Sequence, residues 1–299
     1  MVVRELETKM KSGLFENQAT PLHLIDTDIY AKLECCQRTG SVKDRFVFET
    51  VKKAVIEDEI NTSSTLVEAT SGNTGISLAA AGAALGLPVK IVMPVNMSEE
   101  RKQMMRRFGA EVIEVGPSDF QEAIQKRNDL VRSNENYWSP MQFENPYNVE
   151  VHRAVTGPEI ETQLRKRGVD SWDFVSGAGT GGTLMGLHHF FLEDAQLQGS
   201  KDRRVIQVCP HEDAKSHGIQ GINDGQDFLL DKSLMYETIS VKTADAKKAA
   251  RAFAKEHGIL IGISAGANIV AAKEYKIRNK SRKVVTLLCD RGERYFSSL

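Results

Sequence analysis

Lys43 is the side chain with the most evident chemistry in this sequence, because it precedes three glycine-rich turns that suit bound anions. The lysine lies in TGSVKDR (residues 39–45), and the turns read TSGNTG (70–75), GTGGT (179–183) and GISAG (262–266). Each turn joins a short apolar run to a helical pattern, which places backbone N–H groups and hydroxyls at a helix N-terminus. A lysine amine beside such turns can bond to a carbonyl compound and then act as a local base.

The turn at 179–183 has the composition of a phosphate site. Its glycines let the backbone close around an anion, and Thr180 and Thr183 add hydroxyl donors. No Lys-Ser/Thr pair follows as in a triphosphate loop, and the spacing and acid of a dinucleotide site are absent. A nucleotide-binding module is therefore disfavoured. A small phosphate monoester fits best, although a plain helix–strand turn would show the same pattern.

The two other turns suit the remaining parts of a cofactor and its substrate. The N–H groups and hydroxyls of 70–75 suit a carboxylate, and Asn73 can donate to a phenolic oxygen. Ser264 would set a neutral hydroxyl against a pyridine nitrogen, which favours β-elimination and replacement over transamination. Taken alone, 70–75 is also an ordinary turn and Ser264 an ordinary helix N-cap. Together with Lys43, these are the parts needed to hold pyridoxal phosphate and an amino acid.

The elements that must position these residues alternate between strand and helix. Apolar runs rich in β-branched residues predict strands at 65–68, 90–93, 111–115, 174–176, 205–209 and 284–289. Helical patterns lie between them, such as 74–85, 98–108 and 244–257. Ser98 is the expected N-cap of the second of these helices, and Gly109 its stop.

The same pattern predicts the fold class. The segments 65–86, 173–193 and 259–278 each read strand, glycine-rich turn, helix. Such turns meet at the carboxyl ends of the strands in open α/β sheets, so we expect one shared crevice. The architecture is predicted as α/β, with parallel sheets covered by helices on both faces.

Length, charge and cysteine usage narrow the class of protein further. With 299 residues the chain is long enough for about two domains with cores of their own. A formal net charge of -1 indicates neither nucleic acid nor an anionic membrane as partner. The N-terminus has no signal-peptide apolar core, and the four cysteines form no CxxC pair, so we expect reduced thiols in a cytoplasmic protein. The seven histidines show no metal-ligand spacing, so no metal is expected.

The four motifs, in this order, carry a family resemblance. From TPL (20–22) to GERY (292–295) the chain resembles the fold type II pyridoxal-phosphate enzymes, the tryptophan synthase β-like fold with parallel or mixed twisted sheets. Within them it is similar to the cysteine synthases, or O-acetylserine sulfhydrylases. The stretches EATSGN (68–73), MPVNMSEER (93–101) and CDRGERY (289–295) are similar to the B-type branch, whereas GIQGI (218–222) is similar to the A-type branch.

The resemblance implies a role for each site residue. Lys43 corresponds to the catalytic Schiff-base lysine, Asn73 to the partner of the cofactor phenolate, and Ser264 to the partner of the pyridine nitrogen. The phosphate cup corresponds to Gly179, Thr180, Gly181, Gly182 and Thr183. The site for the substrate carboxylate corresponds to Thr70, Ser71, Thr74 and Gln142.

Two positions bear on substrate and activity. Gln220 stands where phosphoserine-using relatives carry an arginine, and a neutral amide is a poor partner for a dianion. Most relatives have Asn-Pro before the lysine block, whereas this chain has Gln37 and Arg38, so the turn is expected to differ there.

The resemblance also implies domains and partners. We expect a small mobile domain at 46–147 and a large cofactor-binding domain formed by 1–45 and 148–299. The two prolines and two asparagines of 139–148 independently indicate a crossing between domains there. Carboxylate binding at 70–74 should close the small domain and exclude water. The family implies a homodimer that acts on small molecules.

The function implied is a β-replacement that makes L-cysteine or S-sulfocysteine from O-acetyl-L-serine and sulfide or thiosulfate. Three activities on the same fold stay open, namely a cystathionine β-synthase-like reaction, a diaminopropionate-type synthase and a serine/threonine dehydratase. A non-catalytic relative that binds only a ligand or partner is a fourth alternative, against which the presence of Lys43 and Ser264 counts.

Overall fold

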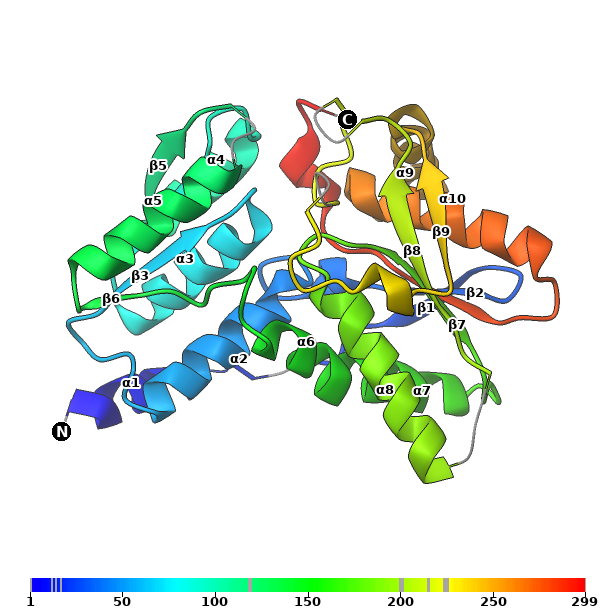
Figure 1. Cartoon of the computed structure of the whole chain (residues 1–299), viewed down its shortest axis with the longest axis horizontal. Helices are drawn as coiled ribbons and strands as arrows, with labels where there is room; N and C mark the ends of the chain where they lie inside the picture. The colour runs from blue at the N-terminus through cyan, green and yellow to red at the C-terminus, as the bar shows by residue number, and fades with distance from the viewer. Residues whose placement is uncertain are drawn as a thin grey trace. The chain divides into compact units, whose positions relative to one another are not determined.

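The structure, a computed structural model, consists of two compact units (Figure 1). It describes residues 2–11, 13, 15–16, 18–117, 120–198, 202–213, 216–222 and 226–298. The first unit contains Met1–Gln18, Arg38–Asn145 and Phe296–Ser298, and the second contains Ala19–Gln37 and Pro146–Tyr295. The step from Asn145 to Pro146 lies inside the stretch 139–148. A mobile domain at 46–147 stays a prediction, as does a large domain at 1–45 and 148–299.

The first unit is built on a four-stranded parallel sheet. The strands are β3 (Thr65–Ala69), β4 (Val89–Pro94), β5 (Glu111–Val115) and β6 (Tyr137–Trp138), in the order β5-β4-β3-β6. The helices are α1 (Val2–Met10), α2 (Lys43–Ile56), α3 (Asn73–Leu85), α4 (Glu99–Arg107) and α5 (Phe120–Ser133). Strand order reverses direction after β5, so right-handed connections put α5 on the opposite face from α3 and α4.

The second unit is built on a six-stranded sheet in the order β1-β2-β10-β7-β8-β9. Its strands are β1 (Leu22–Asp26), β2 (Ile29–Lys32), β7 (Asp173–Gly177), β8 (Val205–Pro210), β9 (Glu237–Val241) and β10 (Val284–Leu287). Among the described strands of this sheet, β1 and β2 pair antiparallel and the other neighbours pair parallel. The longer helices are α7 (Gly157–Arg165), α8 (Gly182–Gln198), α9 (Thr243–His257) and α10 (Ile263–Arg278), and Figure 1 shows α7 and α8 on one face and α9 and α10 on the other.

Small residues bring α9 and α10 into close contact with each other. A Cβ at Gly266 would overlap the carbonyl oxygen of Ala246, so only glycine allows this approach. On its other side α10 buries Ile263, Ala267 and Ala271 against the sheet residues that share their apolar core. Removing this apolar surface from water stabilises the layer by about 25 cal/mol for each Å² buried.

The alternation of strands and helices predicted from the sequence is confirmed, as is the mixed α/β architecture. One predicted strand is wrong. The segment 259–262 forms only an isolated bridge between Ile261 and Arg291, because the short link from α9 to α10 leaves no length for a strand. Ser98 does occupy the N-cap of α4, but its side chain makes no capping hydrogen bond.

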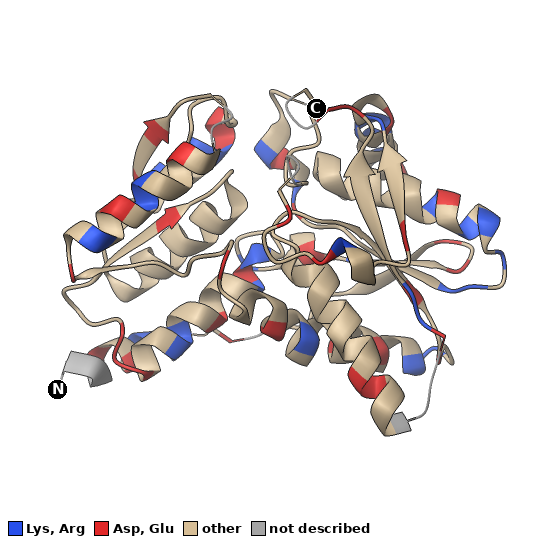
Figure 2. Cartoon of the chain, in the orientation of Figure 1, with Lys and Arg blue, Asp and Glu red and all other residues tan. Residues whose placement is uncertain are grey.

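The distribution of charged and apolar residues along the helices agrees with the near-neutral net charge and ordinary apolar content of the sequence. Figure 2 shows basic and acidic residues interspersed along α2 and α5, in keeping with the net charge of -1. Among the described residues, no helix combines the length and apolar character that crossing a membrane requires. Cys35, Cys36, Cys209 and Cys289 all lie in the described part of the chain as free cysteines, and Cys36 is exposed.

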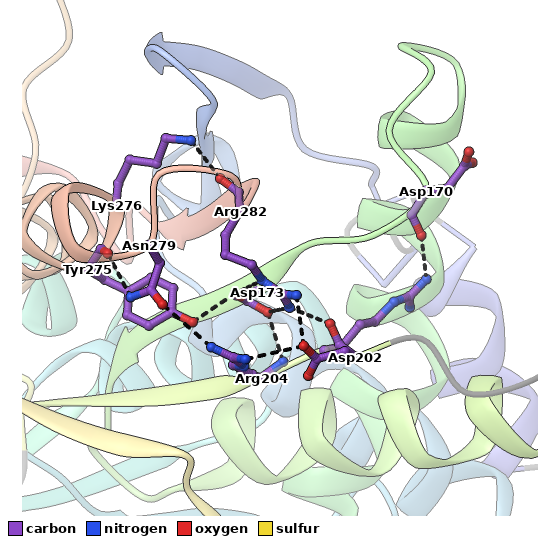
Figure 3. A network of polar contacts seen from close by, with 9 residues as sticks. Asp170, Asp173, Asp202, Arg204, Tyr275, Lys276, Asn279 and Arg282 are labelled. Carbon is purple, nitrogen blue, oxygen red and sulfur yellow. Dashed lines mark hydrogen bonds and ion pairs between the residues drawn. The ribbon is translucent and has the colours of Figure 1, made fainter.

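A buried polar network holds the amino ends of the central strands in the second unit (Figure 3). Asp173, the first residue of β7, is fully buried. It accepts hydrogen bonds from the Tyr275 hydroxyl (2.8 Å), Arg282 Nε (2.6 Å) and the Arg204 backbone N–H (3.0 Å). Burial, with the Asp173 carboxylate, raises the pKa of the Tyr275 hydroxyl. One carboxylate therefore joins β7, β8, α10 and the segment that leads into β10.

We expect Asp173→Asn to lower the free energy of unfolding by about 3–5 kcal/mol, because the neutral amide leaves Arg282 without its buried counter-charge. The side-chain NH2 group of the asparagine would also face a group that donates a hydrogen bond to Asp173 in the wild type. Asp202→Asn is the matched control. Asp202 accepts from the same Arg282 (3.0 Å) and Arg204 (3.2 Å), but its side chain is 67% exposed, so the loss should stay below about 1 kcal/mol. Urea unfolding measures both, and equal losses would contradict the interpretation.

Candidate active site

The turn at 70–75 connects the carboxyl end of β3 to the start of α3. The Thr70 N–H donates to the Val92 carbonyl (3.0 Å), and the Gly72 N–H donates to Thr70 Oγ1 (2.9 Å). Gly72 is the N-cap residue of α3 and has no side chain that could cap the first-turn N–H groups. A helix that begins in this way presents its N–H groups and its dipole to an anion.

Gln142 lies against this turn, 68 residues along the chain from Thr74. The Thr74 hydroxyl donates to Gln142 Oε1 (2.6 Å), and Gln142 Nε2 donates to the Ala69 carbonyl (2.7 Å). The structure thus brings together Thr74 and Gln142, two residues that the resemblance assigns to one substrate site. Their role in binding a carboxylate stays a prediction.

A fully buried ion pair between Glu68 and Arg127 contacts the backbone of Gln142. Glu68, on β3, accepts from the backbone N–H groups of Ala69 (2.7 Å) and Gln142 (2.9 Å) and from Arg127 Nη1 (3.1 Å). Neither Glu68 nor Arg127 is exposed. Burial raises the pKa of Glu68 to about 7, while Arg127 and the two N–H groups act in the opposite direction. The position of Gln142 therefore depends on a buried carboxyl group whose charge Arg127 and two N–H groups only partly stabilise.

Lys43 is half-buried and is the first residue of α2. The next residue, Asp44, is buried and accepts from the hydroxyls of Thr39 (2.5 Å) and Ser77 (2.5 Å). Since Ser77 lies in α3 one turn after Asn73, Asp44 ties the start of α2 to the start of α3. Lys43 and Asn73 therefore lie at the same end of two packed helices.

A buried hydroxyl next to Lys43 points to a polar ligand. Ser41 is fully buried, and its Oγ has no hydrogen-bond partner among the described residues. Buried polar atoms in native proteins nearly always have a partner. The Lys43 segment thus contains a polar group that fits a bound ligand.

The turn at 179–183 follows β7 in the second unit and begins α8. Asn148 Nδ2 donates to Thr180 Oγ1 (2.9 Å), and the Leu229 N–H donates to the Thr180 carbonyl (3.0 Å). Gly181 has φ +91°, and a Cβ there would lie 2.6 Å from the Leu230 nitrogen. A Cβ at Gly182 would lie 2.5 Å from Asn148 Oδ1. Only glycine therefore fits at the two positions where the backbone curves into the helix.

Thr183 is contacted by a histidine from a π-helical segment. This segment (His152–Thr156) lies between α6 (Tyr147–Val151) and α7, and such segments are common at functional sites. His152 is buried, with Nε2 3.2 Å from Thr183 Oγ1 and Nδ1 2.9 Å from Thr156 Oγ1. Sequence reasoning missed both His152 and Asn148, because no local spacing connects them with a turn some 30 residues away.

Ser264 is the second residue of α10 and is buried. The N-cap of α10 is Gly262, so the interpretation of Ser264 as an ordinary N-cap is wrong. A Cβ at Gly221 would lie 3.6 Å from Ser264 Oγ, so the backbone of Gly221 passes close to the hydroxyl. One turn later, Asn268 accepts from the Gly177 N–H (2.8 Å) and donates to the Leu287 carbonyl (2.9 Å). Asn268 thereby fixes the start of α10 to the carboxyl ends of β7 and β10.

The donor sets of the two units suit different parts of one cofactor and its substrate. The 179–183 turn offers N–H groups and hydroxyls at the start of a long helix, which suits a phosphate monoester. Ser264 offers a neutral hydroxyl, which suits a ring nitrogen. The first unit offers the Lys43 amine and the turn at 70–75, whose donors suit an anion. These groups fit pyridoxal phosphate with an amino acid, and a crevice shared by all of them stays a prediction.

Comparisons with known proteins agree with this chemistry. Residues 15–290 match the family model described as "Pyridoxal-phosphate dependent enzyme". A cysteine synthase of Staphylococcus aureus is 38% identical over 286 residues, covering 91% of this chain and 88% of the relative. A cysteine synthase B of Campylobacter jejuni is 39% identical over 279 residues, covering 91% of each chain. The crystal structure of an O-acetylserine dependent cystathionine beta-synthase from Helicobacter pylori is 31% identical, covers 94% of this chain and 95% of its own, and superposes with a TM-score of 0.85.

We expect Arg127→Met to destabilise the protein more at pH 8.5 than at pH 6. A carboxyl whose pKa is raised on folding stabilises the folded state below its unfolded pKa, and this contribution is lost as pH rises through the folded pKa. In the wild type that loss ends near pH 7. Without Arg127 the pKa of Glu68 rises further, so the loss continues above pH 7, at about 1.4 kcal/mol for each added pKa unit.

Urea unfolding at the two pH values measures this difference. The expected loss at pH 8.5 is about 3–5 kcal/mol. Glu144→Gln is the matched control, because Glu144 accepts from the same arginine (2.9 Å) with a half-exposed side chain, and its effect should be below about 1 kcal/mol at both pH values. A loss for Arg127→Met that does not change with pH would show that Glu68 is not the group responsible.

Proposed function

Because the chain belongs to the family of pyridoxal-phosphate-dependent enzymes, we propose that it is a cysteine synthase, a transferase of amino-acid biosynthesis. The reaction is a β-replacement that makes L-cysteine from O-acetyl-L-serine and sulfide, or S-sulfocysteine when thiosulfate is the nucleophile. Cysteine synthases at 38–39% identity over 91% of the chain support this activity.

The observation that carries the proposal is the neutral group at the start of α10. Ser264 is buried and lies in the first turn of α10, whose N-cap residue is Gly262, so its hydroxyl is not needed as a helix cap. When bound, pyridoxal phosphate supplies a ring that withdraws electrons from Cα of the amino acid. A hydroxyl facing the ring nitrogen leaves that nitrogen uncharged and limits this withdrawal. Loss of a good leaving group from Cβ needs less electron withdrawal by the ring than transamination does.

The remaining residues supply binding and orientation. The turn formed by Gly179, Thr180, Gly181, Gly182 and Thr183 holds the phosphate, with the dipole of α8 behind it. Asn73 orients the phenolic oxygen of the cofactor. The substrate carboxylate is bound by Thr70, Ser71, Thr74 and Gln142.

Lys43 has two tasks in the proposed reaction. Its Nζ would hold the cofactor covalently until the amine of the substrate displaces it, and the freed Lys43 amine would then take the proton from substrate Cα as acetate leaves Cβ. After the sulfur nucleophile has added to Cβ, Lys43 returns the proton to Cα. Closure of the small domain at 46–147 over the substrate excludes water during these steps. We also propose a homodimer located in the cytoplasm.

A second candidate differs only in the nucleophile. The similarity to an O-acetylserine dependent cystathionine beta-synthase favours homocysteine as the alternative to sulfide. Competition between sulfide and homocysteine for a limiting amount of O-acetylserine, with both products quantified, separates the two.

The purified protein should be yellow, and Lys43→Ala should lose the visible absorption band of the lysine-bound cofactor. Activity should fall by about 10²–10⁴-fold, because the base that moves the Cα proton is removed. Lys52→Ala on the same helix, with a 43% exposed side chain, is the control and should retain both. Borohydride reduction followed by peptide mapping identifies the attachment site, and label on another lysine would contradict the assignment.

We expect O-acetylserine to exceed phosphoserine in kcat/KM by about tenfold or more, equivalent to about 1.4 kcal/mol. Gln220 is half-buried and offers a neutral amide where a phosphate dianion would need a cation. Gln220→Arg should raise kcat/KM for phosphoserine and leave that for O-acetylserine unchanged, so the difference between the two substrates should shrink. Steady-state rates with both donors test this, and equal efficiencies in the wild type would make phosphoserine the better candidate substrate.

A further inference from the structure

Arg101 is a buried cation whose position is not explained by the helix that carries it. The residue is 1% exposed and lies in the first turn of α4. The helix dipole favours acids at this end, as its neighbours Glu99 and Glu100 illustrate, and disfavours a cation. Burying a guanidinium also costs free energy, which its hydrogen bonds must offset. The reason for a buried cation here must therefore lie outside α4.

The side chain of Arg101 lies against the turn at 70–75. Its Nη1 donates to the Ser71 carbonyl (2.6 Å), while the N–H of the same peptide, from Gly72, donates to Thr70 Oγ1 (2.9 Å). The peptide between Ser71 and Gly72 is thus held at both ends. Its orientation decides where the first turn of α3 points.

Gly72 shows how closely the two parts pack. Its φ of +148° is one that residues with side chains rarely adopt, and a Cβ there would overlap Arg101 Cδ and lie 2.9 Å from Nη1. The glycine is therefore required by the arginine as well as by the backbone. The arginine covers the turn on this side, and a shift of the guanidinium would move the peptide it holds.

The charge of Arg101 adds to the field of α3. An anion at the start of α3 meets the positive end of the helix dipole, and a buried cation beside the same turn strengthens that potential. Salt screens a buried charge far less than an exposed one. The preference of this turn for an anion should therefore depend on Arg101.

We propose that Arg101 is a positioning residue for the substrate carboxylate: it orients the turn at 70–75 through the Ser71 carbonyl and supplies positive potential there. The inference rests on the proposed function, since it assigns the turn to the amino-acid carboxylate. Arg101 acts through the turn and takes no part in moving the Cα proton. Its loss should therefore raise KM for O-acetylserine and leave kcat within about twofold.

The test uses holoenzyme and two probes, L-alanine, which has no leaving group at Cβ, and L-alaninamide, which has no carboxylate. Isothermal titration calorimetry gives both affinities for the wild type and for Arg101→Met, which retains an apolar stem. We expect Arg101→Met to bind L-alanine about tenfold or more weakly and L-alaninamide as the wild type does. Arg101→Lys restores the charge without the planar donors and should bind L-alanine with intermediate affinity.

Lys102→Met is the matched control. Lys102 is the next residue of α4 and is also buried, but its Nζ bonds to the Val95 carbonyl (2.6 Å) and to Glu114 (3.1 Å) and not to the turn. This variant should change the melting temperature and leave the affinity for L-alanine unchanged. Should Arg101→Met not fold, Arg101→Lys carries the test, because it keeps the charge but lacks the planar donors that hold the Ser71 carbonyl, and normal binding of L-alanine by this variant would then contradict the orienting role.

The outcomes separate the two proposals. A wild type that does not prefer L-alanine to L-alaninamide, or forms no cysteine, contradicts the proposed function. A wild type that does both, with variants that still bind L-alanine normally, overturns the role of Arg101. Equal weakening of both probes also overturns it, because that result would indicate general damage to the site.

Discussion

The structure depends on the starts of three helices in its described part, α3, α8 and α10, each of which directly follows a glycine. Gly72, Gly181 and Gly262 directly precede α3, α8 and α10. A glycine has no side-chain oxygen, so it cannot satisfy the N–H groups of the first helical turn. The preceding glycine therefore caps none of these helices, although at α8 the hydroxyl of Thr180 accepts from the Gly182 N–H (3.4 Å). α3 and α8 follow the carboxyl ends of β3 and β7, and α10 follows the short link from α9. In the proposed function, bound anionic or polar groups of the cofactor and substrate accept hydrogen bonds at these helix starts.

Glycine-rich turns need support, and buried polar side chains from distant segments provide it. Glu68, Arg127 and Arg101 hold the turn at 70–75 and its partner Gln142 in the first unit. Asn148 and Asn268 hold the equivalent edge of the second unit. Buried groups of this kind contribute little net stability, because desolvation offsets most of their attraction. Their benefit is one fixed geometry, which is what binding a small cofactor and substrate requires.

Stability and chemistry occupy opposite ends of the second sheet. At the amino ends of the strands Asp173 joins Tyr275, Arg204 and Arg282. Within the described part of the chain, the hydrogen bonds of this network do not reach the residues proposed for the site. At the carboxyl ends lie the turn at 179–183 and Ser264. This separation lets the glycine-rich edge keep its geometry for a ligand while the other edge secures the strands.

The sequence by itself determined the strand–helix alternation and the three turns, and it proposed Lys43 and Ser264 as site residues, because hydrophobic period, glycine and short hydroxyl residues act over a few neighbouring positions. It missed Arg101, Asn148, His152 and Asn268, and it placed a strand at 259–262 that does not form. Arg101 meets Ser71 across 30 residues, and Asn268 meets Gly177 across 91. Only folding decides such contacts, since they depend on how helices pack on a sheet and no local pattern encodes that packing. For the same reason the N-cap of α10 had to be read from the structure, where Gly262 takes the position and leaves the Ser264 hydroxyl for other chemistry.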